Sequence, residues 1–281
     1  ARRVRAPEDD ADQRHTIVSL TVAGKELQHR VTEAASKDAF EVGGRGELRK
    51  ALLNELVLRQ GVAVASSDSF RERLVRFWSN HFAISVDKRI ASLFAAPMER
   101  EAIRPNATGR FGDLLLAVER HPGMLLYLDN AQSVGADSRQ AQRAAQRTQD
   151  RPNARRRGLN ENLAREIMEL HTLGVNAGYS QADVIEFAKA ITGWSVAGQN
   201  DSSDSDGFVF RAYAHEPGDR RVFGSTYRQS GEQQGIAILH ALAVHPATAR
   251  HVSLKLARHF VADQPPPALV ERMARTWVDS G

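Results

Sequence analysis

The densest group of side chains able to do chemistry lies in the run from Gly158 to Gly174. It holds Asn162, Arg165 and Glu166, which are our candidate catalytic residues, and then His171. Amide, imidazole and carboxylate groups suit Zn²⁺, Mn²⁺ or Fe²⁺. Glu166 and His171 are about 140° apart around a helix, so the two side chains cannot chelate one ion without partners from elsewhere.

Histidines outside this run supply such partners. We take His81, Glu166 and His171 as candidate metal ligands, with His215 as a further one, and a divalent metal as the cofactor that this hypothesis requires. A bundle can direct such groups inward from several helices. The chain has no Cys, which excludes zinc fingers and thiol nucleophiles, and no nucleotide-binding glycine motif, so no nucleotide cofactor is expected.

A structural interpretation of the same residues stays open. Asn160 is a suitable N-cap, and Asn162 with Glu166 can form a buried hydrogen-bonded pair. His81 follows an aromatic stretch and is explained equally well as a core histidine with satisfied hydrogen bonds.

A helix from Glu161 to Thr172 must position these groups. Leu163, Ile167 and Leu170 form an apolar stripe, which predicts a central, largely buried helix. We expect Asn162 and Glu166 to face inward, where a carboxylate needs a donor or a cation. Ser180, with Asp183 three residues on, predicts a capping box for the next helix.

Helical periodicity extends over most of the chain outside the irregular segment 195–231. The fold class predicted is all-α, a single domain over 1–281 with a small β-hairpin insertion near 206–224. Within it, Phe208–Phe210 and Arg221–Phe223 are expected to pair as strands. We expect the domain to be a fragment of a longer chain.

Positive charge is concentrated in one segment. The chain has 38 Lys and Arg against 34 Asp and Glu, a net charge of +4. Between 138 and 158, Asp150 is the single acid, among Arg139, Arg143, Arg147, Arg151, Arg155, Arg156 and Arg157. Like charges four residues apart disfavour a helix, so we expect 132–157 to be an exposed, mobile insertion. No aromatic residue interleaves with the arginines, so nucleic acid is not an expected partner.

Several sequence blocks resemble a large bacterial family called domain of unknown function 1800. The resemblance extends from about Phe70 to the C-terminus, through Phe77-Trp-Ser-Asn-His-Phe82, Met124-Leu-Leu-Tyr-Leu-Asp-Asn130, the 160–174 run, Tyr179-Ser-Gln-Ala-Asp-Val184, His245-Pro-Ala-Thr-Ala-Arg250 and Lys255-Leu-Ala-Arg-His-Phe260. It implies a mainly helical fold and export to the periplasm or the cell exterior, but no established activity.

Three hypotheses of function follow. The first is an exported helical protein that acts through an envelope or extracellular partner without chemistry of its own. The second is a metal-dependent, hydrolytic enzyme that uses His81, Glu166 and His171. The third is polyanion binding by the arginine-rich segment. No apolar run approaches the roughly 18 residues that a membrane span requires.

Overall fold

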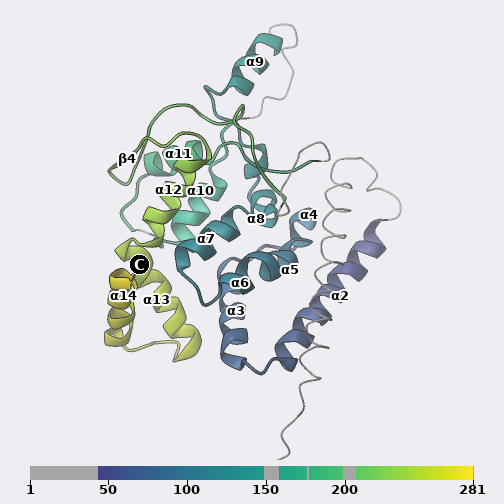
Figure 1. Cartoon of the computed structure of the whole chain (residues 1–281), viewed down its shortest axis with the longest axis vertical. Helices are drawn as coiled ribbons and strands as arrows, with labels where there is room; N and C mark the ends of the chain where they lie inside the picture. The colour runs from purple at the N-terminus through teal and green to yellow at the C-terminus, as the bar shows by residue number, and fades with distance from the viewer. Residues whose placement is uncertain (1–43, 149–157, 176, 199–206, 281) are drawn as a thin grey trace, which may run out of the picture.

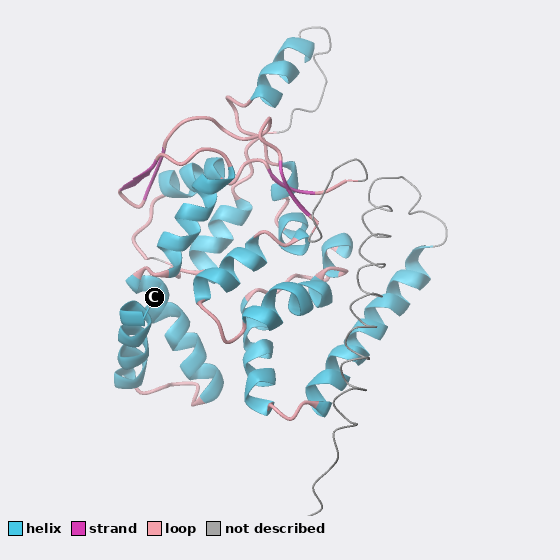
Figure 2. Ribbon diagram, in the orientation of Figure 1, coloured by secondary structure: helices cyan, strands magenta, loops and turns pink. Residues whose placement is uncertain are grey.

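The computed structural model describes residues 44–148, 158–175, 177–198 and 207–280, which are mainly helical (Figures 1 and 2). The α-helices are α2 (Gly44–Ala65), α3 (Ser69–His81), α4 (Arg89–Ser92), α5 (Ala95–Met98), α6 (Arg104–Asn106), α7 (Phe111–Glu119), α8 (Pro122–Tyr127), α9 (Arg139–Thr148), α10 (Asn162–Glu166), α11 (Gln181–Ala190), α12 (Glu232–Ala243), α13 (Pro246–Phe260) and α14 (Pro267–Ser280). Two π-helical turns, η1 (Glu99–Ile103) and η3 (Ile167–His171), and one 3₁₀ turn, η2 (Asn130–Gln132), complete the helical part.

The strands form two short antiparallel pairs, which confirms a mainly α fold with a small hairpin. They are β1 (Trp194–Val196), β2 (Phe208–Phe210), β3 (Arg220–Val222) and β4 (Ser225–Tyr227). β1 pairs with β2, and β3 pairs with β4. The expected pairing of Phe208–Phe210 with Arg221–Phe223 is wrong. Phe223 and Gly224 both have positive φ, so the chain turns back at once and β3 finds its partner in the next strand.

Local capping signals account for several helix starts. Ser180 and Asp183 form the expected capping box at α11. His245 precedes the proline that starts α13, and its Nδ1 accepts a hydrogen bond from the Ala247 N–H. His121 caps α8 in the same way, accepting from the Gly123 N–H. A His-Pro pair therefore begins both helices, because proline suits the first turn and the imidazole satisfies a free N–H.

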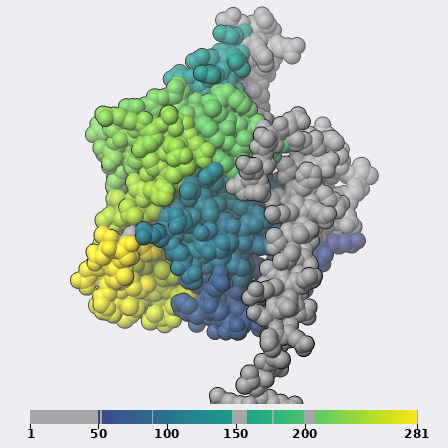
Figure 3. Space-filling model, viewed as in Figure 1, coloured from purple at the N-terminus to yellow at the C-terminus, as the bar shows by residue number. Residues whose placement is uncertain are grey.

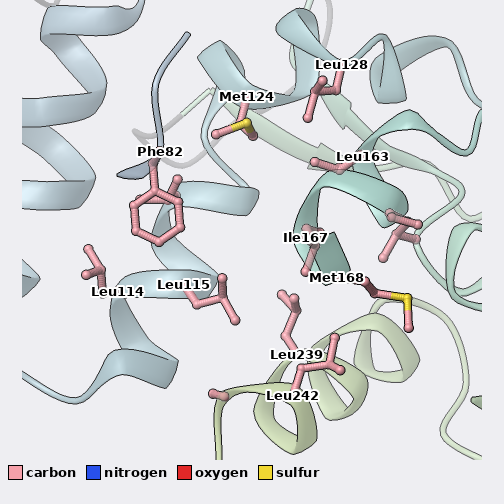
Figure 4. Packing of buried hydrophobic residues seen from close by; sticks show 14 of the residues in the cluster. Phe82, Leu114, Leu115, Met124, Leu128, Leu163, Ile167, Met168, Leu239 and Leu242 are labelled. Atoms are coloured by element: carbon pink, nitrogen blue, oxygen red, sulfur yellow. The ribbon is translucent and has the colours of Figure 1, made fainter. Parts of the chain in front are cut away.

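The core is a continuous apolar cluster that runs from α3 to α13. Figure 4 shows Phe82, at the end of α3, beside Leu114 and Leu115 of α7. On the other side, Ile167 and Met168 of η3 approach Leu239 of α12. The turn that follows the α10 helix is thus built into the middle of the core.

The arginine-rich segment divides into a packed part and a helix. Ser133, Val134 and Ser138 are buried, so the expectation that the whole of 132–157 is exposed is wrong for its first residues. Residues 139–148 form α9, which extends away from the body in Figure 1. The Ser138 hydroxyl accepts from the Ala141 N–H and caps this helix, which offsets the repulsion between the arginines. Residues 149–157 lie outside the described part, and polyanion binding stays a prediction.

The last two helices, α13 and α14, pack against each other as a hairpin. In the space-filling view this C-terminal segment forms one corner of the molecule, beside the segment that contains α3 and α7 (Figure 3). Trp277 of α14 contacts Phe111 of α7, with the ring centroids 5.0 Å apart. Within the described ranges, no helix has the length and apolar character needed to cross a membrane.

Candidate functional site

The predicted helix of residues 161–172 changes from α to π geometry at Ile167. A π turn contains an extra residue, so it rotates the residues that follow relative to an α-helix. The buried side chains therefore recur as pairs four apart: Leu163 and Ala164, Ile167 and Met168, His171 and Thr172. Leu170, expected in the core stripe, is 47% exposed. The expected stripe is wrong at this position because it assumes regular α geometry.

The polar candidates of this helix lie on its outer side. Asn162 is exposed, which contradicts its expected inward orientation, and its backbone N–H donates to Asn160 Oδ1. Arg165 forms a ladder with Glu161 at 3.1 Å and Glu169 at 3.5 Å. Glu166 is half-buried and has no hydrogen bond or ion pair with any residue that the structure describes. The specific partner expected for this carboxylate is therefore not found among the described residues.

His81 and His171 lie next to each other in the core, with ring centroids 6.0 Å apart. The acid that accompanies them is Glu119, whose Oε1 is 2.8 Å from His171 Nδ1. Glu119 has no exposed surface. This residue is not among those predicted from the sequence, although its position carries a signal: Glu119 is four residues after Leu115, on the apolar side of α7.

The hydrogen bonds determine which imidazole nitrogen carries the proton. His81 Nε2 lies 3.0 Å from the carbonyl oxygen of His171, which can only accept, so Nε2 is the donor. Burial lowers the pKa of His81 well below its usual value, and the charges of Lys255 and His171 lower it further. The ring is therefore neutral near pH 7, and its Nδ1 is an unprotonated, buried acceptor without a partner. Glu119 Oε2 is also buried and unpartnered.

The candidate metal ligands are not all brought together. In the described part of the chain, no group of three or more His, Asp or Glu side chains is arranged to hold a metal ion. His215 donates from Nδ1 to the Thr192 carbonyl at 3.0 Å and packs against Phe210 near β2. Its pKa is lowered by burial. These contacts give His215 a structural role beside the sheet, and the metal hypothesis keeps His81 and His171 as ligands.

A cleft of about 1230 Å³ lies close to these histidines, because Trp78 and Phe111 line it and their ring centroids are 5.6 and 6.5 Å from that of His81. Its walls come from α7, α12, α13 and α14, and Trp78, Phe111 and Trp277 form its aromatic part. The indole N–H groups of Trp78 and Trp277 donate to the carbonyls of Ala107 and Ala243, at 3.1 and 3.0 Å. Since both polar atoms are engaged by the backbone, the cleft is lined by the apolar surface of the rings.

Charged side chains stand at the rim of the cleft. Arg110, Asp113 and Arg272 line it and are exposed. No described residue forms a hydrogen bond or ion pair with the guanidinium of Arg110 or Arg272. The cleft could not be predicted from the sequence, because its lining residues come from six separate helices, α3, α6, α7, α12, α13 and α14, and no single motif contains them.

Comparison with known proteins identifies the family. The family model described as "Protein of unknown function (DUF1800)" matches residues 5–281, so the chain belongs to the DUF1800 family. No curated protein matches the chain, and no solved structure matches it.

Proposed function

We propose that this member of the DUF1800 family is a binding protein whose cleft takes an amphiphile, a molecule with an apolar chain and an anionic end. The observation that carries the proposal is the cleft of about 1230 Å³, with an aromatic lining and unpaired arginines at its rim. Export and an envelope role are part of the proposal. Their support is the family resemblance, and an amphiphile is a typical component of an envelope.

The lining favours an apolar chain. Ligand pockets commonly measure about 300–1000 Å³ and are lined mainly by apolar and aromatic side chains. The cleft is somewhat larger than this range, and Leu256, Leu269 and Met273 extend the apolar surface beyond the three aromatic rings. Such a cleft can remove an acyl chain from water, which is favourable in proportion to the area buried.

The rim favours an anionic end. Two arginines and one aspartate line the cleft at exposed positions, so the balance of these charges is positive. A guanidinium binds a carboxylate in a bidentate manner, and neither arginine is already engaged by an acid of the described chain. An exposed pair of this kind contributes about 0.2–1 kcal/mol, enough to select among head groups but not to bind them alone.

The test compares three ligands with the same twelve-carbon chain. Dodecanoate, dodecanol and dodecylammonium are titrated below their micellar concentrations, and tryptophan fluorescence reports binding because Trp78 and Trp277 line the cleft. Dodecanoate is expected to bind most tightly and dodecylammonium most weakly. Equal affinity for all three ligands would contradict the preference for an anionic end. The absence of saturable binding of any of them would contradict the proposal that the cleft binds an amphiphile.

Matched variants locate the binding site. Arg272→Gln is expected to weaken dodecanoate binding about twofold to fivefold and to leave dodecanol binding unchanged. Arg275→Gln is the control, because Arg275 is exposed on the same helix and does not line the cleft. Met273→Glu places a charge on the apolar wall of the cleft and is expected to weaken the binding of both dodecanoate and dodecanol. If Arg275→Gln lost as much affinity for dodecanoate as Arg272→Gln, the assignment of the anionic end to Arg272 would be contradicted.

A metal-dependent enzyme is the alternative proposal, with His81 and His171 as ligands. It is supported by the His171–Glu119 hydrogen bond, because metal-bound histidines commonly donate their other ring N–H to a carboxylate. The positive charge of Lys255 near His81 opposes it. Elemental analysis of the purified protein separates the two proposals: the enzyme requires about one bound metal per chain that is lost in His171→Asn.

A further inference from the structure

A second cavity, of about 380 Å³, lies beside the β1–β2 pair. It is separate from the cleft, because the two cavities share no lining residue. Its walls come from α4, α8, η2, α9, β1 and the segment that follows β2. Segments far apart in the sequence therefore enclose a space that is large enough for a small ligand, since ligand pockets start at about 300 Å³.

Hydrogen bonds join the walls of this cavity to each other. The Ser195 hydroxyl of β1 donates to the Ala131 carbonyl of η2 at 3.2 Å. On the opposite wall, the Gln140 N–H of α9 donates to the Tyr213 carbonyl at 2.8 Å. The chain's own contacts therefore hold the cavity in shape, which lowers the cost of binding a ligand in it.

The polar side chains that line the cavity have hydrogen-bonding capacity left over. The carboxamides of Gln132 and Gln140 bond to no residue that the structure describes, and each has two N–H donors and an acceptor oxygen. The Tyr213 hydroxyl accepts from Arg211 at 3.0 Å, and the Ser133 hydroxyl accepts from a backbone N–H at 3.0 Å. Each of these two hydroxyls can still donate its own proton. A ligand that both donates and accepts hydrogen bonds can therefore be held from three separate segments.

The lining also limits the charge of the ligand. None of the described lining residues is Asp or Glu, and Arg211 is the charged residue among them. Its guanidinium donates to the Tyr213 hydroxyl and, at 3.1 Å, to the Val196 carbonyl. The positive charge disfavours a cation. The ligand is therefore neutral or negatively charged.

The rest of the lining is apolar. Phe94, Val134 and Ala214 are buried and form the inner part of the cavity. Ile90 and Tyr213 are 41% and 44% exposed, so they lie where the cavity opens to solvent. A ring with an apolar face and several hydroxyls on its edge matches this combination, because each hydroxyl both donates and accepts.

We propose that this cavity binds the hydroxylated ring of a sugar, either a neutral hexose or a uronic acid. Gln132, Gln140 and Ser133 supply hydrogen bonds to the sugar hydroxyls. The ring of Tyr213 offers its apolar body to one face of the sugar. A uronic acid gains in addition from the positive charge of Arg211. The proposal does not depend on amphiphile binding, because none of these residues lines the cleft.

Saturation-transfer NMR tests the proposal with glucose, galactose, mannose and glucuronate as probes. At least one of these sugars is expected to bind with roughly millimolar affinity, because a few neutral hydrogen bonds must offset the freedom lost on binding. Binding of glucuronate alone assigns the cavity to uronic acids, and binding of a neutral sugar assigns it to hexoses. No saturation transfer to any of the four sugars would overturn the proposal.

Matched variants of α9 locate the bound sugar. Gln140→Ala removes a carboxamide that lines the cavity and is expected to weaken sugar binding about twofold to tenfold. Gln146→Ala is the control, because Gln146 is exposed on the same helix, does not line the cavity and bonds to no described residue. Alanine favours a helix, so both variants are expected to fold. An unchanged affinity in Gln140→Ala, or an equal loss in both variants, would contradict the proposal.

A variant of the cleft separates this site from amphiphile binding. Met273→Glu changes the wall of the cleft and leaves the second cavity intact, so it is expected to keep the sugar affinity of the unmodified protein. If Met273→Glu abolished sugar binding while Gln140→Ala retained it, the sugar would lie in the cleft and the proposal would be overturned.

Discussion

Two π-helical turns of this protein are built into its interior, and they differ in how their charges are satisfied. At η1, Glu99 is buried and bound by Arg59, by Arg104 at 3.1 Å and by the Ser79 hydroxyl at 2.8 Å. Arg104 also holds Glu72 at 2.5 Å. At η3, His171 has one acid, Glu119, and the nearby Lys255 has none among the described residues.

The two turns therefore differ in whether each charged side chain has an opposite charge beside it. At η1, Arg59 of α2, Glu72 of α3, Glu99 and Arg104 of α6 are all paired with opposite charges, although Glu72 Oε2 is buried without a hydrogen-bond partner. At η3, His81 Nδ1 and Glu119 Oε2 are buried without partners, and Lys255 adds a charge that no described residue pairs. Buried polar groups are usually hydrogen-bonded, and exceptions call for an explanation such as a missing ligand.

The largest predicted effect is at η1. Glu99→Gln removes the charge that Arg59 and Arg104 share, and leaves two partly buried guanidinium groups without full compensation. We expect the free energy of unfolding to fall by about 2–4 kcal/mol, somewhat below the cost for a fully buried pair. Urea denaturation measures this change. A loss below about 1 kcal/mol would mean that the network does not hold the turn.

At η3 the corresponding substitution is predicted to cost less. Glu119→Gln retains an oxygen that accepts from His171 Nδ1–H, so the hydrogen bond survives and the charge is lost. We expect a loss of about 1–2 kcal/mol in the same denaturation experiment. A greater loss for Glu119→Gln than for Glu99→Gln would reverse the comparison between the two turns.

The pH dependence of stability is predicted to come from η3. Folding lowers the pKa of His81, so below pH 6.5 this imidazole is protonated in the unfolded chain and stays neutral in the folded chain. The neutral imidazole therefore contributes to the free energy of unfolding fully above pH 6.5. As the pH falls below 6.5, that free energy decreases by up to about 1.4 kcal/mol per pH unit. His81→Gln keeps a donor for the His171 carbonyl and is expected to flatten the loss between pH 6.5 and 5.5 by about 1 kcal/mol. His240→Gln, at an exposed position, is the control, and an equal slope in both variants would refute the assignment.

Local signals in the sequence predicted much of the fold. The capping box at Ser180 and the His-Pro start at His245 need only neighbouring residues, and both are confirmed. Phe208–Phe210 is a strand as expected, but its partner is Trp194–Val196. Which strand lies beside another depends on how the helices between them pack, and residue spacing does not contain that information.

The candidate site was harder to predict than the fold. The chemistry of their side chains predicts His81 and His171 as site residues, and they do lie together. The position of Glu166 in the same run as His171 favours it as their acid, whereas the buried acid is Glu119, from a different helix. The π turn at Ile167 changes which side chains face the core, and periodicity based on an α-helix does not foresee it.

The smallest predicted effect is at Glu166, the carboxylate that the sequence favours as a metal ligand. Glu166 has no partner in the described chain, so Glu166→Gln is expected to change stability by less than about 0.5 kcal/mol. Glu161→Gln is the matched comparison, because Glu161 accepts from Arg165 at 3.1 Å and from Gln181 at 2.6 Å. Its loss is expected to be about 0.5–1 kcal/mol. If Glu166→Gln lowered the free energy of unfolding by more than Glu161→Gln, this would support the sequence-based prediction that Glu166 has a specific partner.

The contrast between the two turns is tested most directly by two double-mutant cycles measured by urea denaturation. One cycle combines Glu99→Gln with Arg104→Met at η1, and the other combines Glu119→Gln with His171→Asn at η3. The expected coupling energy is about 1–3 kcal/mol at η1, where two opposite charges are paired, and about 0.5–1 kcal/mol at η3, where the glutamine keeps an acceptor for the histidine. A coupling energy at η3 that equals or exceeds that at η1 would contradict this contrast.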